Sequence, residues 1–108
     1  MIDRERIIDT LKKILSELNI DYFKIILFGS RAKGEGTEGS DWDFYIIINN
    51  ISSEQERRKL WYHVYRMFHQ YFPITPVDIV IKDRESYELE KTIINTLSYE
   101  VTVEGLEV

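Results

Sequence analysis

The sequence predicts an α/β domain of the α+β kind: a mixed β-sheet of about four strands packed with helices, in the order α-β-β-α-β-α-β. Three observations predict this fold. The chain has 108 residues, which fit one compact unit, so we expect residues 1–108 to form a single domain. Apolar residues recur at helical spacing in three segments. Runs of β-branched and aromatic residues, typical of buried strands, lie between these segments.

The first half of the chain predicts one helix and two strands. A helix is expected from about Arg4 to Leu18, with Asp3 as its N-cap. Its apolar residues at helical spacing are Ile7, Leu11, Ile14, Leu15 and Leu18. Residues 22–28 predict a buried strand that stops at Gly29, and residues 41–48 predict a second strand. The polar, glycine-rich stretch between them predicts an irregular connection.

The second half predicts two further helices and two strands. Ser53 and Glu56 form a capping box that opens a helix ending before Pro73. Residues 77–81 predict the third strand. A last helix is expected from about residue 86 towards 100, while residues 101–103 favour extended structure. The buried face expected for that helix consists of Leu89, Ile93, Ile94 and Leu97. Gly105 is expected to stop it, and residues 106–108 to form an edge strand.

The lengths of the connections predict how the strands run. The helix between the second and third strands is long enough for a right-handed crossover, which makes those two strands parallel. The first two strands are joined by a short irregular stretch and are expected to be antiparallel. A mixed sheet results.

Composition excludes several classes of function. Without cysteine, the chain has no disulfide, no cysteine nucleophile and no thiolate zinc site. The net charge of −5 argues against a broad nucleic-acid groove, so no stable nucleic-acid binding is expected. No apolar run is long enough to span a bilayer, and residues 1–6 lack the core of a signal peptide. We therefore expect a cytoplasmic protein that does not contact membranes.

One glycine motif has the wrong context for the function its letters suggest. Residues 34–39 read G-x-G-x-x-G, the dinucleotide fingerprint, which requires a strand before it and a helix after it. Here a strand follows, and Glu35 and Glu38 would repel a pyrophosphate. We interpret the segment as a flexible loop.

Paired carboxylates open the second strand. Asp41 and Asp43 are two residues apart, so their side chains point to the same face. Two such carboxylates repel each other unless a cation lies between them, and oxygen ligands suit a hard ion such as Mg²⁺. The alternative is a solvated strand end with no ligand.

Two more features are expected to lie beside this pair. Asp78 is a lone acid near the start of the third strand, and the parallel arrangement would place it next to Asp43; the alternative is an exposed strand end. Gly29 and Ser30 form the turn after the first strand, where the backbone can approach a phosphate closely. Arg31 and Lys33 add local positive charge.

Taken together, these residues resemble a known pattern. The spacing of Gly29-Ser30, Asp41-x-Asp43 and a later Asp78 is similar to the signature of the DNA polymerase β-type nucleotidyltransferase superfamily. The runs 28–34 and 40–43 resemble the minimal nucleotidyltransferase (MNT) family in particular, over nearly the whole chain. The resemblance implies the polymerase β-like nucleotidyltransferase fold.

The resemblance also implies a reaction and a partner. Asp41, Asp43 and Asp78 would be the catalytic residues and would hold two Mg²⁺ ions. Gly29 and Ser30 would bind the β- and γ-phosphates of ATP, with Arg31 as a further phosphate contact. MNT proteins resemble antitoxins that transfer AMP to a tyrosine of an all-helical HEPN toxin. A toxin–antitoxin hetero-oligomer is therefore expected, or an acceptor on a second copy of the chain.

Other hypotheses about the function stay open. The chain could be a non-catalytic antitoxin that neutralises its partner by covering it, using aromatic residues such as Trp61, Tyr62, Tyr71 and Phe72. It could also modify a small molecule. Finally, Arg58, His63 and Tyr65 match the R-x4-6-H-x-Y motif of HEPN ribonucleases, but those domains are all-helical, whereas this sequence predicts strands.

Overall fold

The computed structural model describes residues 3–108, so the first two residues of the N-terminal stretch 1–6 lie outside it. Its elements follow the predicted order, except that the last helical region is divided into two helices. They are α1 (Arg4–Glu17), β1 (Tyr22–Phe28), β2 (Trp42–Ile48), α2 (Glu54–Tyr71), β3 (Val77–Asp83), α3 (Arg84–Glu90), α4 (Leu97–Glu104) and β4 (Leu106–Glu107). Within residues 3–108, no helix is both long and apolar enough to cross a bilayer.

The first two helices begin where the sequence places their caps. The Asp3 carboxylate accepts a hydrogen bond from the Glu5 N–H, and the Ser53 hydroxyl accepts one from the Glu56 N–H. Asn19 follows α1 in a left-handed conformation, at φ 55°, and turns the chain towards β1. Local side-chain chemistry therefore fixes these ends.

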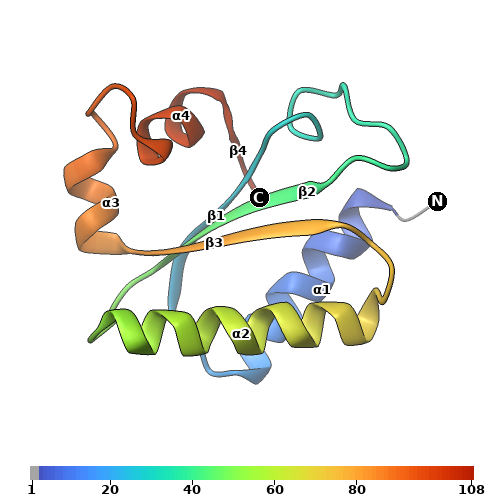
Figure 1. Ribbon diagram of the computed structural model, residues 1–108, viewed down its shortest axis with the longest axis horizontal. Helices are drawn as coiled ribbons and strands as arrows, with labels where there is room; N and C mark the ends of the chain where they lie inside the picture. The colour runs from blue at the N-terminus through green and yellow to red at the C-terminus, as the bar shows by residue number, and fades with distance from the viewer. Residues whose placement is uncertain (1–2) are drawn as a thin grey trace.

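The sheet has the predicted mixed pairing. Its strand order is β3-β2-β1-β4, with β1 antiparallel to β2 and to β4, and β2 parallel to β3. Figure 1 shows α2 crossing below the sheet between β2 and β3. The parallel register pairs Asp43 with Asp78, so two acids distant in sequence become neighbours.

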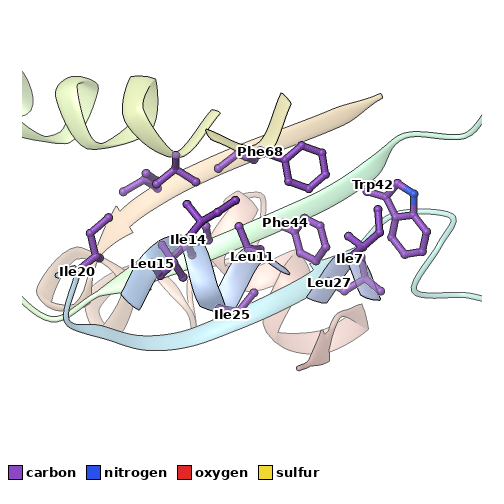
Figure 2. Close-up of a cluster of buried hydrophobic side chains, with 14 of the residues drawn as sticks. Ile7, Leu11, Ile14, Leu15, Ile20, Ile25, Leu27, Trp42, Phe44 and Phe68 are labelled. Atoms are coloured by element: carbon purple, nitrogen blue, oxygen red, sulfur yellow. The ribbon is translucent and has the colours of Figure 1, made fainter. Parts of the chain in front are cut away.

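Each face of the sheet carries its own apolar core, because alternate residues of β2 point to opposite sides. Trp42, Phe44, Ile46 and Ile48 pack with the buried faces of α1 and α2 (Figure 2). Tyr45 and Ile47 pack on the other face with Tyr87 of α3 and Val101 of α4. Asp43 lies on this second face, by the same alternation.

The prediction of one continuous last helix was wrong. Asn95 adopts φ 75°, and Thr96 begins α4 as a new N-cap whose hydroxyl accepts from the Tyr99 N–H and donates to the Glu90 carbonyl. Residues 101–103 are helical rather than extended, because Val101 is buried against the sheet. Tertiary packing overrides their β propensity.

The turn between α3 and α4 also reverses the predicted burial of this region. The residues expected to form its buried face are exposed, with Ile94 at 68%. We call these four residues the apolar strip: Leu89, Ile93, Ile94 and Leu97. Tyr87, Ser98 and Val101 form the buried contacts instead.

A buried hydrogen bond fixes α4 to the sheet and gives a test of this packing. The Tyr45 and Ser98 hydroxyls are 2.5 Å apart, and both residues are buried. Ser98→Ala leaves the Tyr45 hydroxyl without this partner, so we expect a loss of about 1–3 kcal/mol in the free energy of unfolding. Denaturant unfolding measures it. The double variant Tyr45→Phe/Ser98→Ala removes both polar groups and should recover part of the loss; equal stability of Ser98→Ala and wild type would contradict this packing.

Candidate active site

The candidate site lies where β1 ends and where β2 and β3 begin. Asp43, the second residue of β2, is paired with Asp78 of β3 on one side and with Phe28 of β1 on the other. Gly29 and Ser30 follow Phe28 directly. The structure thus brings the predicted carboxylates and the predicted turn to one edge of the sheet.

The three carboxylates interact electrostatically. Burial, then the negative charges of Asp78 and Asp41, raises the pKa of Asp43 above its ordinary value. Asp43 is half-buried, whereas Asp41 and Asp78 are exposed. Mutual repulsion of this kind is relieved when a cation binds between the acids.

The three carboxylates are not arranged as a complete metal-binding site. In the part of the chain that the structure describes, residues 3–108, no three acidic or histidine side chains are grouped closely enough to hold an ion. The donor set nevertheless fits Mg²⁺, because three carboxylates supply only oxygen ligands. Asp41 and Asp78 are exposed, and the three carboxylates would have to approach one another more closely to share a cation.

Gly29 brings the turn against Asp43. Its φ is +73°, and a Cβ at this position would overlap the Asp43 Oδ2 atom. The Gly29 carbonyl accepts hydrogen bonds from the Ala32 and Lys33 N–H groups, at 3.2 and 3.3 Å, which close the turn tightly. Glycine is therefore required by conformation and by space.

The turn is also anchored to α4. The Lys33 ammonium lies 3.4 Å from the Glu104 carboxylate, an exposed ion pair. A hollow of about 150 Å³ lies between the turn and the helix, with Gly29 and Leu97 among its lining residues. One member of the apolar strip, Leu97, therefore borders the candidate site.

Arg31 has partners that the sequence did not predict. Its guanidinium donates to the Ser40 carbonyl at 3.0 Å and to the Glu38 carbonyl at 3.3 Å, and lies 4.4 Å from the centre of the Trp42 ring. A hollow of about 390 Å³ borders Arg31 and Trp42. Trp42 lies on the sheet face opposite Asp43, so these contacts hold the Arg31 guanidinium against the loop before β2 and against the main core.

The G-x-G-x-x-G and R-x4-6-H-x-Y motifs do not lie in the structural context that their usual functions require. The G-x-G-x-x-G segment connects β1 to β2 and is followed by a strand, not a helix, so the dinucleotide context is absent from this part of the described chain. On α2, Tyr65 stacks on Trp61 with ring centres 4.9 Å apart, and Arg58 pairs with Glu54 at 3.5 Å. His63 is exposed.

Of the aromatic residues considered for partner binding, Trp61, Tyr62 and Tyr71 are exposed, whereas Phe72 is buried. Phe72 packs on Phe68 and on the main core, which corrects its place among the surface candidates. Phe68 on α2 and Phe72, the C-cap residue of that helix, are four residues apart, and this helical spacing is the sequence signal for their shared buried face.

Three solved structures resemble the chain in fold. A toxin–antitoxin with AMP-PNP has a TM-score of 0.60 at 20% identity, covering 92% of this chain and 69% of that chain. A candidate minimal nucleotidyltransferase has a TM-score of 0.60 at 21% identity, covering 99% and 97%. A candidate nucleotidyltransferase from Sulfolobus solfataricus has a TM-score of 0.54 at 23% identity, covering 95% and 82%.

The sequence comparisons point the same way as the site. No curated protein matches the chain. The family model of the nucleotidyltransferase domain matches residues 8–103, which include β1, β2, β3 and every predicted site residue. The chain therefore belongs to the nucleotidyltransferase domain family.

Proposed function

We propose that the chain is a magnesium-dependent enzyme that transfers AMP from ATP to a hydroxyl group, a tyrosine, of a protein partner. One observation carries this proposal: the Gly29 backbone lies so close to Asp43 that no side chain fits between them, while Asp78 is paired with Asp43 on the other side. The turn to which we assign phosphate binding is thereby adjacent to two of the carboxylates to which we assign metal binding. Membership in the nucleotidyltransferase family supports the reaction type.

The metal would be held by Asp41, Asp43 and Asp78, as two Mg²⁺ ions. The oxygen donors and the raised pKa of Asp43 support a cation at this position. When bound, the metal would neutralise charge on the triphosphate and on the attacking and leaving oxygens.

The residues of the chain have distinct tasks in the proposed reaction. The Gly29–Ser30 turn would hold the β- and γ-phosphates through backbone N–H groups and the Ser30 hydroxyl. The acceptor oxygen forms a bond to the α-phosphorus, and the bond from this phosphorus to the oxygen that bridges it to the β-phosphorus breaks. Pyrophosphate leaves, and AMP stays bound to the acceptor. The acceptor proton passes to a carboxylate, a task that we assign to Asp78 because it is exposed beside Asp43.

For the acceptor, we propose a HEPN-type toxin, which the chain would silence as its antitoxin in the cytoplasm. The fold likeness to a protein of a toxin–antitoxin pair supports a toxin partner. The apolar strip supports a protein rather than a small molecule, because Leu97 belongs to the strip and also lines the hollow beside Gly29. A protein docked there would present a side chain close to the site.

Transfer of label tests the catalytic proposal. The chain is incubated with Mg²⁺, ATP labelled at the α-phosphate, and the product of the neighbouring gene. We expect label on the partner protein, lost in Asp41→Asn and Asp43→Asn and kept in Asp9→Asn, a matched change of an exposed carboxylate on α1. Absence of label, or equal labelling by all variants, would refute the proposal.

The apolar strip also favours a second candidate, a binding-only antitoxin that neutralises its partner by covering it. The triple variant Asp41→Asn/Asp43→Asn/Asp78→Asn separates the two candidates in cells that express the toxin. Catalytic silencing predicts that the triple variant, although folded, fails to rescue growth. Full rescue would establish the binding-only function instead.

A further inference from the structure

One side chain connects the two halves of the proposed site. Arg31 directly follows Ser30 in the turn, and its Nη2 atom donates to the carbonyl of Ser40 at 3.0 Å. Ser40 directly precedes Asp41. The same Nη2 atom donates to Glu38 at 3.3 Å. The turn assigned to phosphate binding is thereby linked to the loop that leads into the carboxylates.

The guanidinium is also fixed from the side of the core. Its central carbon lies 4.4 Å from the ring centre of Trp42, a distance at which the cation attracts the aromatic face. Trp42 is only 4% exposed and stands at one end of the main core (Figure 2). Arg31 therefore contacts both sequence neighbours of Asp41, which are Ser40 and Trp42.

The glycine-rich loop closes over the Arg31 side chain. A Cβ at Gly36 would lie 2.6 Å from the Arg31 Cδ and 3.2 Å from its Nε. The Nε atom is buried, and within residues 3–108 it has no hydrogen-bond partner. By contrast, a Cβ at Gly39 would meet no atom within 4 Å. A side chain at position 36 would therefore collide with Arg31, whereas a side chain at position 39 would meet nothing.

A short turn within the loop transmits this anchoring to Asp41. The Thr37 N–H donates to the Ser40 hydroxyl at 2.9 Å, and the Ser40 N–H donates to the Thr37 carbonyl at 3.0 Å. The loop segment that Arg31 contacts is therefore stabilised by hydrogen bonds of its own. Movement of Arg31 would displace Ser40, and with it the start of β2.

We infer that Arg31 is a positioning residue, and that Gly36 is the residue that makes room for it. Arg31 holds the 36–40 loop and Trp42 so that Asp41 keeps its place opposite the Gly29–Ser30 turn. This inference rests on the proposed function, because it concerns the same nucleotide site. It assigns to Arg31 a role in the geometry of the site in place of a direct contact with phosphate.

Four variants test the inference: Arg31→Ala, Arg31→Lys, Gly36→Ala and the control Gly39→Ala. Calorimetry measures their affinity for AMP-PNP with Mg²⁺. Acrylamide quenching in a Trp61→Phe background reports the accessibility of Trp42, the remaining one of the two tryptophans. We expect the first three variants to weaken AMP-PNP binding about tenfold or more and to increase quenching, because displaced groups lose the geometry of the site. Gly39→Ala should match wild type in both measurements.

The lysine variant separates positioning from charge. An ammonium group could still attract a phosphate, but it lacks the flat guanidinium that lies over the Trp42 ring while its Nη2 atom donates to the Glu38 and Ser40 carbonyls. If Arg31→Lys restores AMP-PNP affinity and Gly36→Ala binds as wild type does, the charge of Arg31 is what matters and the inference is wrong. If wild type binds no AMP-PNP, the proposed function fails, and unchanged quenching in Arg31→Ala and Gly36→Ala would separately refute the anchoring.

Discussion

Replacing Gly29 by alanine is expected to abolish nucleotide transfer. The new Cβ would overlap the Asp43 carboxylate, and the residue would have to keep φ at +73°. The turn or Asp43 must therefore move, and we expect the transfer rate to fall about 100-fold or more, since small displacements at a reacting site have effects of this size. The positive φ adds a loss of about 1–2 kcal/mol in the free energy of unfolding.

Gly34 provides a matched control for this variant. It has the same φ of +73°, but a Cβ there would meet no atom within 4 Å. Gly34→Ala should show the conformational cost in thermal unfolding while keeping its transfer activity. If Gly29→Ala and Gly34→Ala lose activity equally, strain in the loop, and not contact with Asp43, determines the effect.

Replacing Asp43 by asparagine is expected to separate activity from stability. Transfer should fall about 100-fold or more, because metal and phosphate lose a central carboxylate. The fold should be at least as stable as wild type at pH 7. In the native chain, burial and the charges of Asp78 and Asp41 disfavour ionisation of Asp43, and asparagine removes that repulsion.

The pH dependence of stability follows from the same raised pKa. Since the folded pKa of Asp43 lies above the unfolded value, the native state binds more protons between those two values than the unfolded state does. The contribution of Asp43 to stability is therefore present below the unfolded pKa and is lost as pH rises through the folded pKa. Without metal, the stability advantage of Asp43→Asn over wild type should grow across this range, in urea unfolding at several pH values. An advantage that shrinks as pH rises would contradict the assigned electrostatics.

Most of the fold could be predicted because its signals are local. Helix α1 follows from the spacing of Ile7, Leu11 and Ile14, and α2 from its cap at Ser53, within a residue or two of the observed ends. The juxtaposition of Asp43 and Asp78 followed from a topological rule, since a helical crossover makes the two strands parallel. These predictions needed no knowledge of distant contacts.

The features that could not be predicted depend on contacts between distant segments. Asn95 and Thr96 are residue types that favour a left-handed turn and an N-cap, but the apolar spacing of residues 86–100 continues across them and gives no sign that they divide the helix. Likewise, the partners of Arg31 depend on how the 36–40 loop folds over Trp42, which no spacing rule describes. From the sequence alone, the positive charge of Arg31 beside a glycine turn is equally compatible with a phosphate contact.

The apolar strip illustrates the same limit. The helical spacing of Leu89, Ile93 and Leu97 predicts a buried face, yet the turn before α4 leaves these residues in solvent. An exposed surface of this kind is typical of a protein-binding site. The exposure of these residues, on which the proposed partner contact rests, therefore becomes visible only when the three-dimensional structure is known.

The central claim is that the three carboxylates and the Gly29–Ser30 turn form one site for a metal-bound triphosphate. Calorimetric titration of the chain with AMP-PNP tests it most directly, with and without Mg²⁺. The account predicts binding heat that requires Mg²⁺ and is lost in Asp43→Asn but kept in Asp9→Asn. Equal heat without Mg²⁺, equal heat in Asp43→Asn, or no heat from the wild-type chain would contradict it.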